Sequence, residues 1–295
     1  MLFEAVPNIS EGRDEETIRR IVEPVRSVPG VCLLGLHSDP DHNRSVLTLA
    51  GEEEPLLEAA LALARACASE IDLSSQSGVH PRMGSLDVLP FVPLEGTTLE
   101  DAARLARRAG ERLGELGFAV YFYETAATAP HRRNLADVRS GGYAGLAARI
   151  EDPLWRPDYG PSTLSPRLGA VAVGARPFLV AFNAYLDTTD VEIAREVARR
   201  VRERDGGLPA VKALGLEVGG RAQVSMNLTD LEKTPLPIAL EAVRANAAEC
   251  GARVESTELV GLAPLEALLQ TARHYLALRE LDRRDILETR LWEDD

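Results

Sequence analysis

The chain has 295 residues, of which 45% are hydrophobic and 27% are charged, as in a globular protein that buries a sizeable core. Such a length fits about two domains of ordinary size. There are 46 acidic and 33 basic residues, and the resulting net charge of −13 repels the phosphate backbone of nucleic acids. We therefore expect no nucleic-acid partner.

The sequence also predicts a cytoplasmic protein with no membrane partner. No apolar stretch approaches the roughly 20 residues that cross a bilayer, and the first residues lack the pattern of a secretion signal. Cys32, Cys67 and Cys250 stand far apart, so they indicate neither a disulfide framework nor a zinc site. This cysteine usage fits a reducing compartment.

Nucleotide-binding and serine-hydrolase motifs are absent from the sequence. The only lysines, Lys212 and Lys233, do not follow a glycine, so there is no Walker A loop. No two of the 23 glycines are separated by a single residue, which excludes the GxG core of a dinucleotide site. Glycines spaced four apart enclose Arg112, Tyr143 or Glu217 rather than serine, so there is no nucleophile elbow.

The N-terminal half predicts a mixed α+β domain. Apolar residues alternate in some segments and recur at helical spacing in others, with turn residues between them. In chain order we expect a strand at 2–9, a helix at 10–27, strands at 31–39 and 44–51, a helix at 54–71, a strand at 83–94, a helix at 97–116 and a strand at 118–124. Strand, helix, strand, strand, helix, strand is the ferredoxin-like order, extended here by one more helix and strand.

A connecting region follows. Residues 132–149 have the periodicity of a helix, whereas residues 152–169 contain four prolines and two glycines without apolar periodicity. We interpret the second stretch as a long ordered loop or a domain connection.

A second βαββαβ series occupies the C-terminal half. In chain order we expect a strand or hairpin at 170–186, a helix at 188–204, two strands within 211–228, a helix at 238–252, a strand at 254–262 and a last helix at 264–281. The predicted fold class is therefore α+β, a duplicated and elaborated pair of ferredoxin-like subdomains. We expect them at residues 1–175 and 176–295, with a cleft for a small molecule between them.

His80 is the candidate for proton transfer. It lies in the segment GVHPRMGSLDVLPF, next to a proline and just before a strand, and an unperturbed imidazole pKa of about 6.5 suits acid–base chemistry at neutral pH. Arg82 and Asp87 are close enough in the sequence to orient it or to bind an anion. A surface histidine in a turn is the simpler interpretation of the same pattern.

Residues 37–46, HSDPDHNRSV, concentrate polar side chains between two strands. Asp39 and Asp41 begin a pattern like a calcium loop, but other residues occupy the positions of its essential glycine and glutamate. His37 and His42 would suit zinc only with a third ligand from elsewhere. We therefore expect no metal, and we interpret the segment as a polar turn that orients a catalytic base or binds a carboxylate substrate.

Asn183 and Asn227 lie inside otherwise apolar strands, where a buried amide is either satisfied by the backbone or directed at a ligand. Glu124 and Glu258 are carboxylates at strand ends. Together these residues suggest a polar cleft, but they specify no reaction.

Seven longer motifs resemble those of one known family. They are VPNISEGR at 6–13, SDPDHNRSVLTLAG at 38–51, HPRMGSLDVLPFVPL at 80–94, WRPDYGPSTLSPRLGA at 155–170, GARPFLVAFNAYL at 174–186, VSMNLTDLEKTPL at 224–236 and ELVGLAPLEALL at 258–269. With these motifs the chain resembles the glutamate formimidoyltransferases, the formiminotransferase part of the bifunctional formiminotransferase-cyclodeaminases.

The resemblance implies both a fold and a reaction. The fold is a duplicated ferredoxin-like α+β fold, usually a homodimer, with a substrate tunnel between the halves. The reaction transfers the formimino group from N-formimino-L-glutamate to tetrahydrofolate and gives 5-formiminotetrahydrofolate and L-glutamate, as in histidine degradation. Tetrahydrofolate is then a co-substrate, no metal is expected, and a separate cyclodeaminase is expected to process the product.

The resemblance also implies roles for individual residues. The family's catalytic histidine, in the HPR motif, falls on His80. The family's folate contacts fall on the loop made of Gly160, Pro161, Ser162, Thr163, Leu164, Ser165, Pro166, Arg167, Leu168 and Gly169.

Further roles follow from the chemistry of this reaction. We expect Asp39 or Asp41 to orient the catalytic histidine and stabilise positive charge, and Arg44 and Arg82 to bind the substrate carboxylates. The strand residues Asn183 and Asn227 are additional candidates for the site.

Some points stay open at this level. Val79 stands where the family often has an acidic residue, so we expect a lower pKa for His80 than in its relatives. No residue decides between a formimino and a formyl donor, and polyglutamate preference is equally undetermined. Two other hypotheses are a folate-binding or scaffold protein without efficient turnover, and a metal-dependent hydrolase that uses the histidines and aspartates of residues 37–42.

Overall fold

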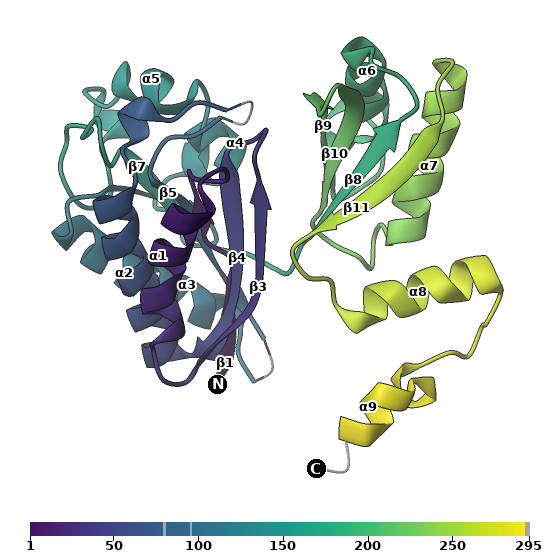
Figure 1. Cartoon of the computed structure of the whole chain (residues 1–295), viewed down its shortest axis with the longest axis horizontal. Coiled ribbons are helices and arrows are strands. Elements are labelled where there is room, and N and C mark those ends of the chain that lie inside the picture. Colours follow the sequence, from purple (N-terminus) through teal and green to yellow (C-terminus); the bar gives the residue numbers. More distant parts are fainter. Residues whose placement is uncertain (79–80, 95, 293–295) are drawn as a thin grey trace. The chain divides into compact units, whose positions relative to one another are not determined.

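The computed structural model describes residues 1–78, 81–94 and 96–292 of the chain (Figure 1). The chain forms two compact units, Met1–Pro177 and Phe178–Asp295, which we call unit 1 and unit 2. Each unit contains one β-sheet of its own. No helix in the described ranges is both long and apolar enough to cross a bilayer.

Unit 1 contains one large mixed sheet. Its helices and strands are β1 (Leu2–Ala5), β2 (Asn8–Ile9), α1 (Glu15–Arg26), β3 (Val31–Asp39), β4 (Arg44–Glu52), α2 (Glu53–Glu70), β5 (Leu86–Pro93), α3 (Leu99–Glu115), β6 (Ala119–Glu124), α4 (Leu135–Val138), α5 (Gly142–Ala147) and β7 (Ala170–Ala175). The strands β3, β4, β1 and β5 pair antiparallel in that order, which is the ferredoxin-like arrangement. At the β5 edge, β7 and then β6 continue the sheet in parallel pairing.

Helices α1, α2 and α3 cover one face of this sheet (Figure 1). Local interactions define where two of them begin: Asp14 accepts hydrogen bonds from two backbone amides of α1, and Thr98 and Asp101 form a capping box on α3. The apolar stripes of the helices pack on sheet residues such as Phe3 and Phe91, which are fully buried.

Part of the other face is covered by the long segment between β6 and β7. Val138 and Leu146 from this segment form a small core with Val88 and Tyr121 of the sheet. This covered area lies on the β5, β6 and β7 side of the sheet, so only the added strands and their neighbour receive this second layer.

The single helix predicted at 132–149 is wrong. Two short helices, α4 and α5, occupy the region instead; Gly141, between them, and Gly142, the first residue of α5, have φ angles of 75° and 58°. A residue in the left-handed conformation interrupts an α-helix, so the apolar periodicity of residues 132–149 belongs to two short helices rather than to one long helix.

The strand or hairpin predicted at 170–186 is also wrong. β7 lies in the sheet of unit 1 between β5 and β6, whereas β8 (Val180–Leu186) lies in the sheet of unit 2. Pro177 lies between the two strands and has no amide hydrogen to donate to a hairpin ladder. Each strand is paired instead with partners that are distant in the sequence.

Unit 2 repeats the ferredoxin-like order on a smaller scale. Its helices and strands are β8, α6 (Val191–Val201), β9 (Val211–Val218), β10 (Arg221–Leu228), α7 (Leu236–Glu249), β11 (Val254–Val260), α8 (Leu265–Leu276) and α9 (Leu287–Trp292). The antiparallel sheet has the order β11-β8-β10-β9, and α6 and α7 pack on one face of it. The prediction of an α+β fold with two ferredoxin-like subdomains is confirmed; the cleft between them and the boundary at 175/176 stay predictions.

Candidate functional site

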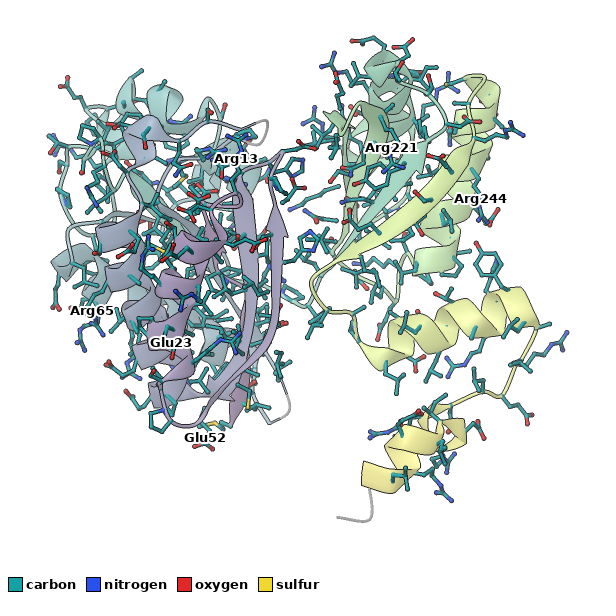
Figure 2. All side chains as sticks on the ribbon, in the orientation of Figure 1. Arg13, Glu23, Glu52, Arg65, Arg221 and Arg244 are labelled. Carbon is teal, nitrogen blue, oxygen red and sulfur yellow. The ribbon has the colours of Figure 1, made fainter. Side chains whose placement is uncertain are left out.

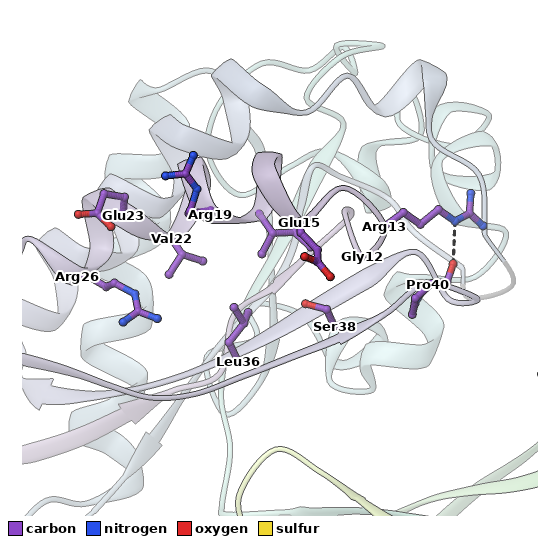
Figure 3. A pocket seen from close by; sticks show the side chains of 11 residues that line it. Gly12, Arg13, Glu15, Arg19, Val22, Glu23, Arg26, Leu36, Ser38 and Pro40 are labelled. Carbon is purple, nitrogen blue, oxygen red and sulfur yellow. Dashed lines mark hydrogen bonds between the residues drawn. The ribbon is translucent and has the colours of Figure 1, made fainter.

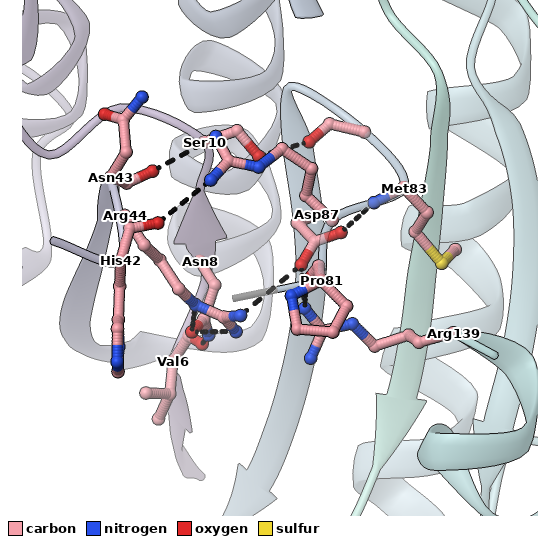
Figure 4. A network of polar contacts seen from close by, with 12 residues as sticks. Val6, Asn8, Ser10, His42, Asn43, Arg44, Pro81, Met83, Asp87 and Arg139 are labelled. Atoms are coloured by element: carbon pink, nitrogen blue, oxygen red, sulfur yellow. Dashed lines mark hydrogen bonds and ion pairs between the residues drawn. The ribbon is translucent and has the colours of Figure 1, made fainter. Parts of the chain in front are cut away.

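Polar and charged side chains gather in unit 1 where β4 and β5 begin (Figure 4). They come from β2, the turn between β3 and β4, the first residue of β4, the segment before β5, the start of β5 and the residue that follows α4. Hydrogen bonds and ion pairs connect them. We call this group the polar cluster, and it consists of Asn8, Asn43, Arg44, Arg82, Asp87 and Arg139.

Arg44, the first residue of β4, lies at the centre of the polar cluster. Its Nε and Nη2 donate to Oδ1 of Asn8 at 2.8 and 2.5 Å, and its Nη1 lies 3.5 Å from Oδ2 of Asp87. Burial, together with the positive charge of Arg139, lowers the pKa of Arg44 to about 9. The guanidinium therefore keeps its positive charge at neutral pH.

Asp87 is the carboxylate that these arginines share. The pairing of β2 with β5 shifts by one residue at Asp87, a β-bulge that changes the direction of its side chain. Its Oδ2 lies 2.5 Å from Nη2 of Arg139, and its Oδ1 accepts a hydrogen bond from the Met83 amide at 2.7 Å. The Asp87 side chain is 2% exposed, so these ion pairs are buried.

Arg82 holds the turn between β3 and β4. Its Nη2 donates to the carbonyl of His42 at 2.9 Å, and its Nη1 to the carbonyl of Asn43 at 3.4 Å. The buried Asn43 accepts the Gly12 amide at 2.9 Å through Oδ1 and donates to the carbonyl of Ser77 at 3.0 Å through Nδ2. Side chains thus join this turn to the segments on both sides of it.

Asp39 and Asp41 lie in the same region. Oδ1 of Asp39 accepts the backbone amide of His42 at 2.8 Å, and Oδ2 lies 3.6 Å from Nδ1 of His42. Asp41 is an exposed residue of the turn. In the part of the chain that the structure describes, no three His, Cys, Asp or Glu side chains form a group that could hold a metal ion.

The predicted catalytic residue His80 and its neighbour Val79 lie outside the described residues. The chain that follows them is held by several contacts. The carbonyl of Pro81 accepts a hydrogen bond from Nη2 of Arg139, and the next carbonyl accepts one from the Tyr143 amide at 2.9 Å. The structure therefore places Arg139 and the backbone of Tyr143 beside the segment that follows the HPR histidine.

The predicted folate loop, residues 160–169, lies in unit 1 and ends beside this segment. Gly169 forms a β-bridge with Gly84 and has a φ angle of 68°. A Cβ atom at Gly169 would lie 2.1 Å from the carbonyl oxygen of Met83, so only glycine fits here. The motif glycine is thus explained by chain packing, and contacts between this loop and folate stay a prediction.

The side chains of this loop differ in their surroundings. Arg167 donates through Nε to the carbonyl of Ala68 at 3.1 Å, and also donates to the carbonyl of Ser69, both in the last turn of α2. Ser162 and Thr163 are exposed. Arg167 therefore has a structural role as a helix cap, whereas the two hydroxyls face solvent.

The two strand asparagines lie in unit 2. Asn183, on β8, is 6% exposed and donates through Nδ2 to Oε2 of Glu258 at 3.3 Å; the hydroxyl of Tyr185 donates to the same oxygen at 3.2 Å. Asn227 on β10 is exposed, because it alternates with the buried residues that face the helices. The expectation of a buried amide holds for Asn183 and is wrong for Asn227.

The same face of β10 carries Arg221 (Figure 2). Its guanidinium carbon lies 4.3 Å from the centre of the Tyr185 ring, a cation–π contact, and its Nη1 lies 3.1 Å from Glu255. This surface of unit 2 is polar but less buried than the polar cluster of unit 1.

Sequence reasoning missed Asn8 and Arg139 as members of the site. Asn8 lies in one of the motifs quoted above, but nothing in the sequence pairs it with Arg44, which is 36 residues away. Arg139 is 52 residues from Asp87 and lies in a region where a single helix is expected. Only the fold brings these side chains together.

A groove with a volume of about 340 Å³ opens in unit 1 between α1 and β3 (Figure 3). Arg13 at one end donates through Nε to the carbonyl of Pro40 at 2.7 Å, while Val22 and Leu36 form apolar parts of the lining. The side chains that line it are separate from those of the polar cluster.

Two family models match almost the whole chain. The model described as "Formiminotransferase domain, N-terminal subdomain" matches residues 2–176, and the model described as "Formiminotransferase domain" matches residues 181–289. The chain belongs to the formiminotransferase family. The predicted family and the prediction of a transferase are thereby confirmed, and the two matches correspond to unit 1 and unit 2.

This formiminotransferase is similar to named relatives over nearly its full length. It is 43% identical to the glutamate formimidoyltransferase of Thermoplasma acidophilum, over 98% of this chain and 97% of the relative. It is 40% identical to the glutamate formimidoyltransferase of Streptococcus pyogenes serotype M1, over 98% of both chains. The formimidoyltransferase-cyclodeaminase of Sus scrofa is 43% identical over 93% of this chain, which spans 52% of that longer protein.

Proposed function

We propose that this formiminotransferase is a glutamate formimidoyltransferase, which moves the formimino group of N-formimino-L-glutamate to tetrahydrofolate in histidine degradation. The products are 5-formiminotetrahydrofolate and L-glutamate. The observation that carries the proposal is the similarity, at 43% and 40% identity over almost the whole length, to two enzymes of that name.

The transfer requires two proton movements. Nitrogen five of the reduced pterin attacks the formimino carbon, and the tetrahedral intermediate loses the proton from that nitrogen while the departing glutamate nitrogen gains one. One histidine can serve as base and then as acid. We assign this role to His80, the histidine of the HPR motif.

Arginine side chains bind the anionic substrates in this proposal. Both glutamate and the tail of folate carry carboxylates, and the protein as a whole is negative at −13. The polar cluster contains three arginines and one carboxylate, Asp87, with which Arg44 and Arg139 pair. Arg44 and Arg82 are the arginines that we assign to the substrate carboxylates.

The remaining site residues have supporting roles. Asp39 or Asp41 orients the catalytic histidine, and the loop of residues 160–169 contacts folate. Asn183 and Asn227 contribute amides from unit 2. Holding both substrates in one site supplies the proximity that a two-substrate transfer needs.

The cellular setting follows from the same proposal. We expect a cytoplasmic homodimer that takes free tetrahydrofolate and passes its product to a separate cyclodeaminase. Cyclodeaminase is the second activity in the names of the relatives from Mus musculus and Sus scrofa.

The test is a spectrophotometric assay with tetrahydrofolate and N-formimino-L-glutamate, in which acid converts the product to its methenyl form. Wild type should turn over, and His80→Asn should lose at least about 100-fold in rate because the acid–base group is gone. His274→Asn, at an exposed position on α8, is the matched control and should retain the wild-type rate. Equal rates for H80N and H274N would contradict the assigned base.

Two other outcomes would change the proposal. Turnover only with N-formylglutamate would replace the donor, and folate binding without turnover of either donor would favour a binding or scaffold protein. A metal-dependent hydrolase would require a stoichiometric metal by elemental analysis and loss of activity on chelation.

A further inference from the structure

Arg139 connects two distant parts of the site. It directly follows α4, in the segment between β6 and β7, and its side chain is 12% exposed. The same Nη2 atom donates to the carbonyl of Pro81 and lies 2.5 Å from Oδ2 of Asp87. A single guanidinium nitrogen thus bridges a backbone oxygen and a buried carboxylate.

These contacts close a ring around residues 81–83. The Pro81 carbonyl is bound to Arg139, Arg139 is paired with Asp87, and Asp87 accepts the amide of Met83. The peptide between these ends is held as well, because its carbonyl, that of Arg82, accepts the Tyr143 amide at 2.9 Å. The segment therefore has little freedom to rotate about its backbone bonds.

The ring lies directly after the histidine to which we assign proton transfer. Pro81 is bonded directly to that histidine in the sequence, so the backbone that the ring fixes begins at the next residue. A misplacement of about 1 Å in a catalytic group lowers a rate by about 100-fold. A residue that fixes the following peptide can therefore control the reaction without touching a substrate.

We propose that Arg139 is a positioning residue of the transfer reaction, which fixes residues 81–83, the segment that directly follows the assigned catalytic histidine, through Pro81 and Asp87. This inference rests on the proposed function. It predicts an effect on the chemical step rather than on substrate binding, which Arg44 and Arg82 supply.

A second buried arginine of unit 1 provides the matched control. Nη1 of Arg132 lies 2.9 Å from Oδ2 of Asp158, and its Nη2 donates to the carbonyls of Leu154 and Arg156 at 2.7 and 2.6 Å. Its side chain is 6% exposed. Arg132 therefore matches Arg139 in burial and in the type of its partners, but it contacts a different part of the chain.

The experiment compares Arg139→Met, Arg139→Lys, Arg132→Met and wild type in steady-state kinetics with both substrates, and measures 5-formyltetrahydrofolate binding by titration calorimetry. R139M should lower kcat by about 100-fold while KM for both substrates and the folate Kd stay within about twofold. R139K should recover kcat to within about tenfold of wild type, because an ammonium group can donate to both acceptors. R132M should lower the unfolding temperature without this selective loss of kcat.

The proposal is overturned if R139M keeps the wild-type kcat, if its defect lies in KM, or if R132M shows the same selective loss. Should R139M fail to fold, R139K decides: a kcat that is lower than wild type by up to about tenfold, with unchanged KM, supports the proposal, and a wild-type kcat or a raised KM overturns it. A wild-type enzyme without transfer activity would instead contradict the proposed function itself, so the two failures are distinguishable.

Discussion

Unit 1 and unit 2 have the same strand order but differ in what lies on the sheet face away from the helices. In unit 1 this face carries the polar cluster, in which Arg44 and Arg139 both pair with the side chain of Asp87, which is 2% exposed. In unit 2 the corresponding contacts are weaker, since Asn183 and Tyr185 reach the half-buried Glu258 at 3.3 and 3.2 Å.

The difference comes from the strands and connections added to unit 1. The segment between β6 and β7 supplies Arg139 and the predicted folate loop, and unit 2 has no comparable addition within its described residues. Both units thus share the ferredoxin-like sheet, and the segment between β6 and β7 of unit 1 adds Arg139 to the polar cluster. Three pairs of variants, one member in each unit, test this contrast, and we give them in order of decreasing expected effect.

The largest effect is expected at Gly169. Gly169→Ala adds a Cβ 2.1 Å from the Met83 carbonyl oxygen at a φ of 68°, so the backbone must move and unfolding free energy should fall by more than about 4 kcal/mol. Gly220→Ala is the control in unit 2, with a similar φ of 71° and no atom within 4 Å of the added Cβ. It should cost only about 1 kcal/mol. Urea unfolding would measure both, and equal losses would show that backbone strain, not packing, determines the effect.

The second effect concerns the buried carboxylates. Asp87→Asn removes the charge shared by Arg44 and Arg139 and should lower unfolding free energy by about 3 to 5 kcal/mol, because two buried cations lose their partner. Glu258→Gln keeps an oxygen acceptor for Asn183 and Tyr185, so a loss below about 1 kcal/mol is expected. Chemical denaturation measures both variants. A larger loss of unfolding free energy for E258Q than for D87N would show that the carboxylate contacts of unit 2, not those of unit 1, contribute more to stability.

The smallest effect depends on pH. Glu4 in unit 1 is 5% exposed, and burial raises its pKa above the usual 4.5, against the opposing charge of Arg176. The folded state therefore binds the proton more tightly than the unfolded state, and ionisation of Glu4 destabilises the protein as pH rises above 4.5. Glu4→Gln should therefore be more stable than wild type at pH 7 and equal to it at pH 4.

Glu196 in unit 2 should behave in the opposite way. Hydrogen bonds from Arg199 and Arg200 lower its pKa to about 2, so its stabilising contribution is present above pH 4.5 and is lost as pH falls through about 2. Glu196→Gln should therefore have a lower unfolding temperature than wild type at pH 7 and the same one at pH 2. Thermal unfolding at the two pH values measures both variants, and a less stable E4Q at pH 7 would show that attraction to Arg176 outweighs burial.

Much of the fold could be predicted from local patterns. The helices at 15–26 and 99–115 have clear apolar stripes and caps, the helix at 53–70 has many apolar residues at helical spacing, and the strand at 31–39 alternates in burial. The two wrong predictions concern segments in which the local sequence pattern does not show where a helix breaks or which strand a segment pairs with. Residues 132–149 form two short helices, and residues 170–186 contribute one strand to each sheet, because pairing with distant strands decides which sheet a strand joins.

The amino-acid sequence was enough to predict the family, the ferredoxin-like order of both units and the motif segments that carry the candidate site. Which side chains meet at that site depends on the tertiary structure. It joined Asp87 to Arg139 and Arg44 to Asn8, and it showed that Gly169 is required by the Met83 carbonyl. The physical reason is that hydrogen bonds and ion pairs depend on distances of a few ångströms between residues that are 36 to 52 positions apart, and chain packing alone sets those distances.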